Sequence, residues 1–254
     1  MAVNKMWLLD CGQLWVDRST ILYRTGMGEK LKIPVSAALV ETTDGYLLFD
    51  TGLNPDAVDK REEVLGHKAP IIADISPADD IRNRLEEVGV KVSDVRWVLN
   101  SHLHWDHTGG NKFFPNAEFI LQKEEWRFAR DPDQFVTEVY LQSQFDLNRQ
   151  YTLLDGSTEI TEGVAVINTR GHTPGHQSLV VNLPDRGYVV YAGDALYCPE
   201  SLEELRPPGN AWNMREAYRS LTELKFWQTH LGADIIIGHE PDLWKSYTGQ
   251  EAFR

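Results

Sequence analysis

The stretch Ser101-His102-Leu103-His104-Trp105-Asp106-His107 places three imidazoles and one carboxylate between positions 102 and 107. It directly follows the apolar segment 95–99, which is typical of a buried strand. Buried polar side chains need partners, and this many ligand groups at one strand end are costly unless they bind a cation. A solvated polar loop is the alternative interpretation, but the density of ligand types favours a metal site.

The size and charge of the chain limit the class of protein. Its 254 residues contain 42% hydrophobic and 25% charged residues, as in ordinary globular proteins. No linker rich in Pro or Gly interrupts the chain, so we expect one domain over residues 1–254. The net charge of −13 disfavours nucleic acid and anionic membrane surfaces as partners, and leaves a small molecule as the expected one.

The cellular compartment is inferred from the N-terminus and the cysteines. The first residues lack the basic and then apolar pattern of a signal peptide, and no apolar run is long enough to cross a bilayer. Only Cys11 and Cys198 are present, far apart and without metal-site spacing. The sequence therefore predicts reduced thiols and a cytoplasmic location. It assigns no role to Cys198.

The hydrophobic pattern predicts more strands than helices in each half of the chain. Strands are expected at 5–10, 35–40, 46–49, 95–99, 118–121, 164–168, 178–182, 188–192 and 234–237. Helices are expected at 77–88, with Ser76 as N-cap and Gly89 as the stop, at 123–147 and at 214–231. Because helices separate groups of strands, we predict an α/β (α+β) fold in which two sheets pack together with helices outside.

Three more candidate ligands lie at the ends of later strands, each beside a glycine. They are His172, Asp194 and His239. Together with the first loop they make five His and two Asp, too many for one tetrahedral zinc but suited to two adjacent ions bridged by one carboxylate. His67 and His230 lack this context and are expected on the surface or on a helix. His176 is expected to stabilise its turn, with a role behind the ligands as the alternative.

The motifs resemble those of the metallo-β-lactamase superfamily over essentially the whole chain. Within it, three segments resemble the N-acyl homoserine lactone lactonases, which are quorum-quenching enzymes: Ser101 to Asn111, Gly171 to Leu179, and Asp194-Ala195-Leu196-Tyr197. The resemblance implies a four-layer αβ/βα sandwich of two mixed β-sheets with outer helices. It also implies a metal-dependent hydrolase of carboxylic ester bonds, and a homodimer as one possible assembly.

The resemblance further assigns roles to individual residues. One ion is expected on His102, His104 and His172, and the other on Asp106, His107 and His239, with Asp194 as the bridge. Asp50, in an Asp-Thr-Gly turn, is expected to orient a ligand histidine from behind. Glu240 departs from the family, because these lactonases often have Asp after the last histidine.

The expected reaction is the opening of an N-acyl homoserine lactone by a hydroxide that bridges two divalent ions. Zinc is expected first, with Co, Mn or Fe as alternatives. The expected catalytic residues are Asp106, Asp194 and Tyr197, whose phenol would assist the oxyanion or the leaving oxygen. Trp105 and Trp15 are expected near the acyl chain, although plain packing is the alternative for both.

Two other functions stay open on the sequence. One is a different lactone or thioester hydrolase of the same superfamily, similar to pyridoxolactonase or glyoxalase II. A glutathione thioester would favour additional basic residues near the site. The other is a protein that binds or senses metal without turnover, which a complete ligand set beside a proton donor disfavours. A nuclease on this scaffold is disfavoured by the net charge of −13.

Overall fold

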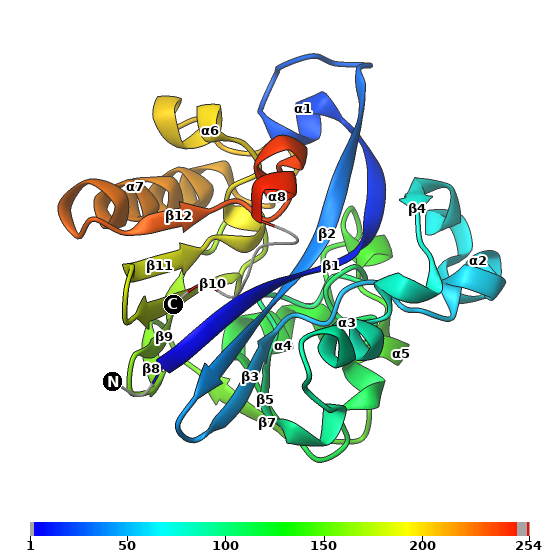
Figure 1. Ribbon diagram of the computed structural model, residues 1–254. Helices are drawn as coiled ribbons and strands as arrows, with labels where there is room; N and C mark the ends of the chain where they lie inside the picture. The colour runs from blue at the N-terminus through cyan, green and yellow to red at the C-terminus, as the bar shows by residue number, and fades with distance from the viewer. Residues whose placement is uncertain (1–2, 248–252, 254) are drawn as a thin grey trace.

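Two β-sheets face each other in the computed structural model, which describes residues 3–247 and 253 (Figure 1). The first is a seven-stranded sheet with the order β4-β1-β2-β3-β5-β6-β7. Its pairs are antiparallel from β4 to β3 and parallel from β3 to β7, so the sheet is mixed. Its strands are β1 (Val3–Asp17), β2 (Lys30–Thr42), β3 (Gly45–Phe49), β4 (Ile72–Asp74), β5 (Val95–Leu99), β6 (Glu118–Gln122) and β7 (Tyr151–Leu154).

The second sheet has five strands in the order β12-β11-β10-β9-β8. Only the β11–β12 pair is parallel, so this sheet is also mixed. Its strands are β8 (Thr158–Thr161), β9 (Val164–Asn168), β10 (Gln177–Leu183), β11 (Gly187–Tyr191) and β12 (Asp234–Ile236).

Strand β2 shows why the first sheet is buried on both faces. Successive side chains of a strand point to opposite faces. Ala38 and Val40 pack in the cluster between the two sheets, together with Val181 of the second sheet. Ala37 and Leu39 pack on the other face, in the cluster beneath the outer helices. This continuous apolar run therefore supplies two cores at once.

Helices cover the outer face of each sheet. Leu85 of α3 (Ile81–Glu87) packs in one cluster with Leu48 of the first sheet. Leu221 of α7 (Met214–His230) packs with Val190 of the second sheet. In Figure 1, α7 lies along the five-stranded sheet, on the opposite side of the molecule from α2 and α3. The predicted four-layer sandwich of two mixed sheets is confirmed.

The remaining helical segments are short. None of the helices among residues 3–247 combines the length and apolarity needed to cross a bilayer. The α-helices are α1 (Arg18–Ile21), α2 (Ala57–Leu65), α4 (Lys123–Arg130), α5 (Gln142–Phe145), α6 (Pro199–Glu204) and α8 (Pro241–Tyr247). The 3₁₀ turns are η1 (Gly66–Ile71), η2 (Pro77–Asp79), η3 (Val92–Asp94), η4 (Asn111–Phe113), η5 (Thr137–Val139) and η6 (Gly193–Ala195).

The helix predicted over 77–88 is divided in two. Asp80 is extended, with ψ 124°, and its side chain accepts a hydrogen bond from the backbone of Arg82, so it is the N-cap of α3. Ser76 instead closes the preceding 3₁₀ turn by donating from its backbone N–H and its hydroxyl to Asp79. The predicted stop is correct, because Gly89 has φ +77° just after the helix end.

The helix predicted over 123–147 was also too long. Helix α4 ends at Arg130, and Asp131 is already out of helical geometry. The next residue is Pro132, which disfavours helical geometry at the residue before it and has no N–H to donate. The chain then forms η5 and α5, with loop between them. The predicted helix over 214–231 is confirmed within one residue by α7. Cys11 and Cys198 are free thiols, as expected.

The segment after β5 returns to pack on the turn after β3. Gly109 donates its backbone N–H to the carbonyl of Gly52 at 2.9 Å. A Cβ atom at Gly109 would lie 2.0 Å from the backbone N of Asn54 and 2.3 Å from the carbonyl carbon of Leu53. Only glycine allows this approach, which seats the loop 102–107 against the first sheet.

We therefore expect Gly109→Ala to lower the free energy of unfolding by about 3 kcal/mol, because two backbones must separate. Gly232→Ala is the control. Its Cβ would meet open space, and only its φ of +66° is unfavourable, at a cost of about 1 kcal/mol. Urea unfolding of the purified variants measures both values. Equal losses would show that the approach at Gly109 is not tight.

Candidate metal centre

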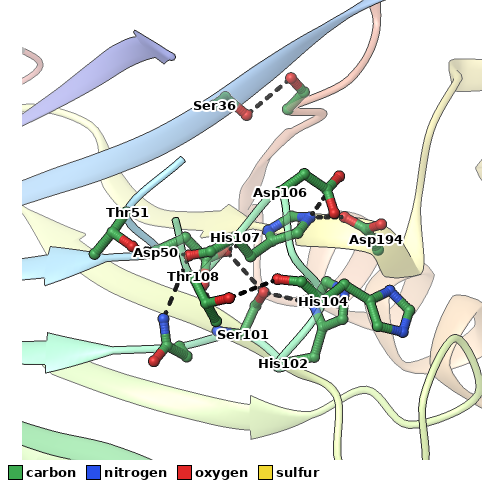
Figure 2. A network of polar contacts seen from close by, with 12 residues as sticks. Ser36, Asp50, Thr51, Ser101, His102, His104, Asp106, His107, Thr108 and Asp194 are labelled. Carbon is green, nitrogen blue, oxygen red and sulfur yellow. Dashed lines mark hydrogen bonds and ion pairs between the residues drawn. The ribbon is translucent and has the colours of Figure 1, made fainter. Parts of the chain in front are cut away.

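The loop after β5 carries the first group of candidate ligands. His102 and His107 are buried, whereas His104 and Asp106 are partly exposed. In Figure 2 these four side chains lie together beside Asp194. The Oδ2 atom of Asp106 lies 3.5 Å from Nε2 of His107. The structure therefore brings the whole first motif to one place, at the end of a strand of the seven-stranded sheet.

Asp50 holds this loop from beneath. It directly follows β3 and has φ +63°. One of its carboxylate oxygens accepts the backbone N–H of Ser101 at 2.7 Å. The other oxygen accepts the Ser101 hydroxyl at 2.7 Å and Nδ1 of His107 at 2.9 Å (Figure 2). Asp50 thus fixes both the path of the loop and the orientation of the His107 imidazole, which is a candidate ligand.

Hydrogen bonds place the ring protons of three imidazoles on their outer nitrogens. Ser101 Oγ gives its proton to Asp50, so at 2.8 Å it accepts one from Nδ1 of His102. Nδ1 of His107 donates to Asp50. Nδ1 of His239 donates to the backbone carbonyl of Pro34 at 2.7 Å. In the neutral form of each ring, Nε2 then carries the lone pair, which can bind a cation.

Asp194 lies at the centre of the remaining candidate ligands. It sits in η6, after β11, with one carboxylate oxygen 2.8 Å from Nε2 of His239 and 3.2 Å from Nε2 of His107. The other oxygen is 3.3 Å from Nε2 of His172, which is in turn 3.1 Å from Nδ1 of His104. The strand ends of both sheets therefore meet at a single carboxylate.

The donor set fits divalent metal ions. Among the described residues, two triads have ligand atoms within 4.8 Å of one another: His102, His104 and His172, and His102, His107 and Asp194. Within this cluster, three buried imidazole nitrogens make no hydrogen bond: His102 Nε2, His107 Nε2 and His172 Nδ1. Buried nitrogens without partners are costly in a finished core, and a cation would satisfy the Nε2 atoms.

The electrostatics of the cluster favour a cation. Burial lowers the pKa of His102 and of His104 well below the usual value, and the neighbouring imidazoles add to this effect. Burial also lowers the pKa of His107, but the carboxylates of Asp194 and Asp106 outweigh it and raise that pKa well above its usual value. Burial raises the pKa of Asp194, yet the surrounding imidazoles hold it well below its usual range. The carboxylate is thus ionised, and a cation would take the electrostatic place of the His107 proton.

Tyr197 reaches the same centre from the segment after η6. Its ring stacks on His239 with centroids 5.1 Å apart, and its hydroxyl donates to Asp194. Burial, and next the Asp194 carboxylate, raise the pKa of Tyr197 well above its usual value, so the phenol keeps its proton. Nδ2 of Asn210 donates to the Tyr197 oxygen at 3.0 Å. A protonated donor therefore stands beside the candidate metal centre.

A cavity of about 440 Å³ opens above these groups. Trp105 and Trp15 both line it, as do Tyr197 and Asn210. Trp105 is only 3% exposed, whereas Trp15 is 44% exposed, so the first is mainly packed and the second reaches solvent. Much of the remaining wall is apolar and includes Leu14, Ile33, Ile71, Phe128, Phe135 and Trp212. A polar centre below an apolar chamber suits a ligand with one reactive polar end.

The other histidines divide as their sequence context suggests, with one difference. His67 and His230 are exposed. His176 does more than close its own turn, because its Nε2 accepts the backbone N–H of Asp194 at 3.0 Å. Burial, and next the neighbouring His172, lower its pKa to about 3, so the ring is a neutral acceptor. His176 therefore holds the segment that carries the central carboxylate.

Several supporting groups were missed from the sequence. Asn210 lies in a segment without periodicity, Pro207-Pro208-Gly209-Asn210, where no motif marks it. The partner of His239 is a backbone carbonyl, which any residue at position 34 would supply. Ser36 donates to the carbonyl of Gly238, the residue before His239, at 2.9 Å (Figure 2). The contact between His176 and the Gly193-Asp194 segment was the exception, because both lie next to strands predicted from the sequence.

Comparisons with known proteins agree with this geometry. The model of the metallo-beta-lactamase superfamily matches residues 32–227. An N-acyl homoserine lactonase from a Bacillus species is 33% identical over 242 residues, which cover 94% of each chain. The N-acyl homoserine lactonase AttM of Rhizobium radiobacter is 30% identical and covers 96% of this chain, with 95% of its own length matched.

A solved structure extends the likeness to three dimensions. It is an N-acyl homoserine lactone hydrolase with the product N-hexanoyl-L-homoserine bound at the catalytic metal centre. It superposes with a TM-score of 0.89 at 30% identity and covers 100% of both chains. Fold, ligand cluster and sequence thus agree, and the chain belongs to the metallo-β-lactamase superfamily.

Proposed function

We propose that this protein is a metal-dependent lactonase that opens the ring of N-acyl homoserine lactones. The observation that carries the proposal is the convergence of His and Asp side chains from both sheets on Asp194, beside a protonated Tyr197 and below an apolar cavity. Relatives named N-acyl homoserine lactonase match nearly the whole chain, which supports the same substrate class.

The proposed centre holds two divalent ions. His102, His104 and His172 would bind one, while Asp106, His107 and His239 would bind the other, with Asp194 shared. Bound divalent ions lower the pKa of a coordinated water and polarise a substrate carbonyl. Zinc is the first choice for this His and Asp set, and Co, Mn or Fe are compatible with it.

The side chains of the protein would do the rest. Asp194 and Asp106 would supply the negative charge that holds the cations. Tyr197 donates to Asp194 in the free protein and, with substrate present, would donate to the oxyanion or to the leaving ring oxygen. Asn210 already donates to the Tyr197 oxygen, so the phenol is oriented as a donor.

The cavity also bears on the alternative thioester substrate. Among the described residues that line it, the only Lys or Arg is Lys68, whose Nζ is 2.5 Å from Glu138. A glutathione thioester carries anionic groups that need free cationic partners. An apolar wall with its one lysine already paired favours an acyl chain instead.

Oligomeric state, the single domain over 1–254 and the cytoplasmic location stay predictions.

The protein loaded with metal should open both short-chain and long-chain N-acyl homoserine lactones, each product gaining one water by mass spectrometry. Metal analysis should give two ions per chain.

Asp194→Asn weakens the attraction for cations and should lower metal affinity roughly tenfold to a hundredfold, with activity falling in parallel. A protein that binds metal yet opens no lactone of the panel would instead be a metal-binding or sensing protein.

Tyr197→Phe should lower kcat roughly a hundredfold, because the donor to the developing charge is lost while the proposed metal ligands remain. Metal content should not change. Tyr218→Phe is the matched control, since this tyrosine is 49% exposed on α7. Steady-state kinetics with metal analysis would refute the role of Tyr197 if both variants kept wild-type kcat.

Trp15→Ala should raise KM for long acyl chains more than for short ones. The exposed indole is the part of the wall that a long chain would cover, and each methylene that loses its contact costs about 0.8 kcal/mol. Phe226→Ala, which removes an aromatic ring 47% exposed on α7, is the control. If KM rises equally for all chain lengths, Trp15 does not contact the acyl chain.

A further inference from the structure

Glu125 is a fully buried carboxylate that the proposed reaction does not use. It lies on α4 and is 0% exposed, although the adjacent Glu124 has a side chain 55% exposed. An ionised side chain in this position is costly unless every oxygen finds donors. Burial raises the pKa of Glu125, while the hydrogen bonds that it accepts act in the opposite direction.

The two carboxylate oxygens of Glu125 each accept two hydrogen bonds. Oε1 accepts the backbone N–H of Leu103 at 3.0 Å and the hydroxyl of Tyr140 at 3.2 Å. Oε2 accepts the hydroxyl of Thr173 at 2.6 Å and the backbone N–H of Gly175 at 3.1 Å. All four partners are donors, so the carboxylate is satisfied as an acceptor.

Apart from Tyr140, these donors belong to two different loops that carry candidate ligands. Leu103 stands between His102 and His104 at the end of a strand in the seven-stranded sheet, whereas Thr173 follows His172, which lies between strands of the five-stranded sheet. The loops are far apart in sequence, yet one oxygen of Glu125 binds each of them.

The second loop also approaches α4 closely. A Cβ at Gly175 would lie 2.2 Å from the backbone N of Glu125. Tyr140 extends the same support to the cavity wall, because its ring packs edge-on against His104 with centroids 4.8 Å apart. Glu125 thus binds the chain next to each member of the His102, His104 and His172 triad, through Leu103 on one side and Thr173 on the other.

We propose that Glu125 is a positioning residue that sets the spacing between the two loops, and so the geometry of the His102, His104 and His172 triad. The present spacing places Nε2 of His172 3.1 Å from Nδ1 of His104. The inference rests on the proposed metal centre. A residue that only stabilised the fold would alter the unfolding of the metal-free protein and leave the affinity of both ions unchanged.

Glu125→Gln tests the proposal with little change in volume. The amide presents N–H groups to one pair of donors, so one of the two loops loses its partner. The matched control is Glu124→Gln on the same helix, where an exposed carboxylate lies 3.5 Å from the guanidinium of Arg127. Metal-free protein would be titrated with Co²⁺, with visible absorption and calorimetry reporting on each ion.

The wild type and Glu124→Gln should each take up two Co²⁺ ions, and for each ion the two proteins should have the same affinity. Glu125→Gln should bind one ion normally and the other roughly tenfold to a hundredfold more weakly, as is typical when a group supporting a ligand is lost. Thermal unfolding of the metal-free proteins, measured in parallel, separates this effect from a change in stability. Unchanged affinity for both ions in Glu125→Gln would overturn the inference.

Thr173→Val keeps the proposal testable if Glu125→Gln does not fold. It removes one of the two donors to Oε2, so three of the four donors to the carboxylate remain. Binding of the same ion should therefore become weaker, by a smaller factor than in Glu125→Gln. Unchanged Co²⁺ affinity in a folded Thr173→Val protein would also count against the inference. A wild type that binds no Co²⁺ would overturn the proposed function itself, which distinguishes the two failures.

Discussion

The buried carboxylate of Asp194 is the interaction on which the site depends. Three imidazoles, from His107, His172 and His239, come within 3.3 Å of its two oxygens. They arrive from different strand ends, so the two sheets must keep a fixed relation at this edge. The interior between the sheets is closely packed by interdigitated apolar residues, which supplies the required rigidity. The packed sheets therefore hold the imidazoles at fixed distances from Asp194 at one edge of the sandwich.

A layer of buried polar groups behind the candidate ligands fixes their positions and the orientation of their rings. Asp50, through Ser101 and directly, fixes the protonated nitrogens of two imidazoles. His176 holds the backbone of Asp194, and Glu125 joins two ligand loops. Each of these groups is buried and satisfied, so the ligand atoms are presented without large rearrangement. Preorganisation of this kind lowers the entropic cost of binding metal and substrate.

The sequence predicted most of the described strands and the cluster of candidate ligands because their signals are local. It missed β4, β7 and β8, each of which lies at the edge of a sheet. Each candidate ligand follows an apolar run and stands beside glycine or within the dense motif of 102–107, and the apolar runs mark the strands. The helix ends were harder. The side-chain cap at Asp80 and the break before Pro132 each changed a boundary that periodicity alone had extended.

The supporting groups were less accessible to sequence reasoning. Glu124 and Glu125 are identical residues side by side, and only the phase of the helix against the core distinguishes them. Asn210 reaches Tyr197 from a loop whose path depends on packing against α1, where Gly209 donates its N–H to Thr20. Such contacts depend on tertiary arrangement, which no pattern within a short window encodes.

The carbonyl of Pro34 that receives the Nδ1 proton of His239 has a consequence for how this protein evolves. A side-chain partner can be lost by one substitution, but a backbone acceptor is supplied by all twenty amino acids. Position 34 can therefore vary in sequence while the hydrogen bond persists, provided that β2 keeps its path. Mutational scanning would report this position as tolerant even though one of its atoms sets the tautomer of a candidate ligand. Sequence variability and functional importance are thus separate properties at this point of the chain.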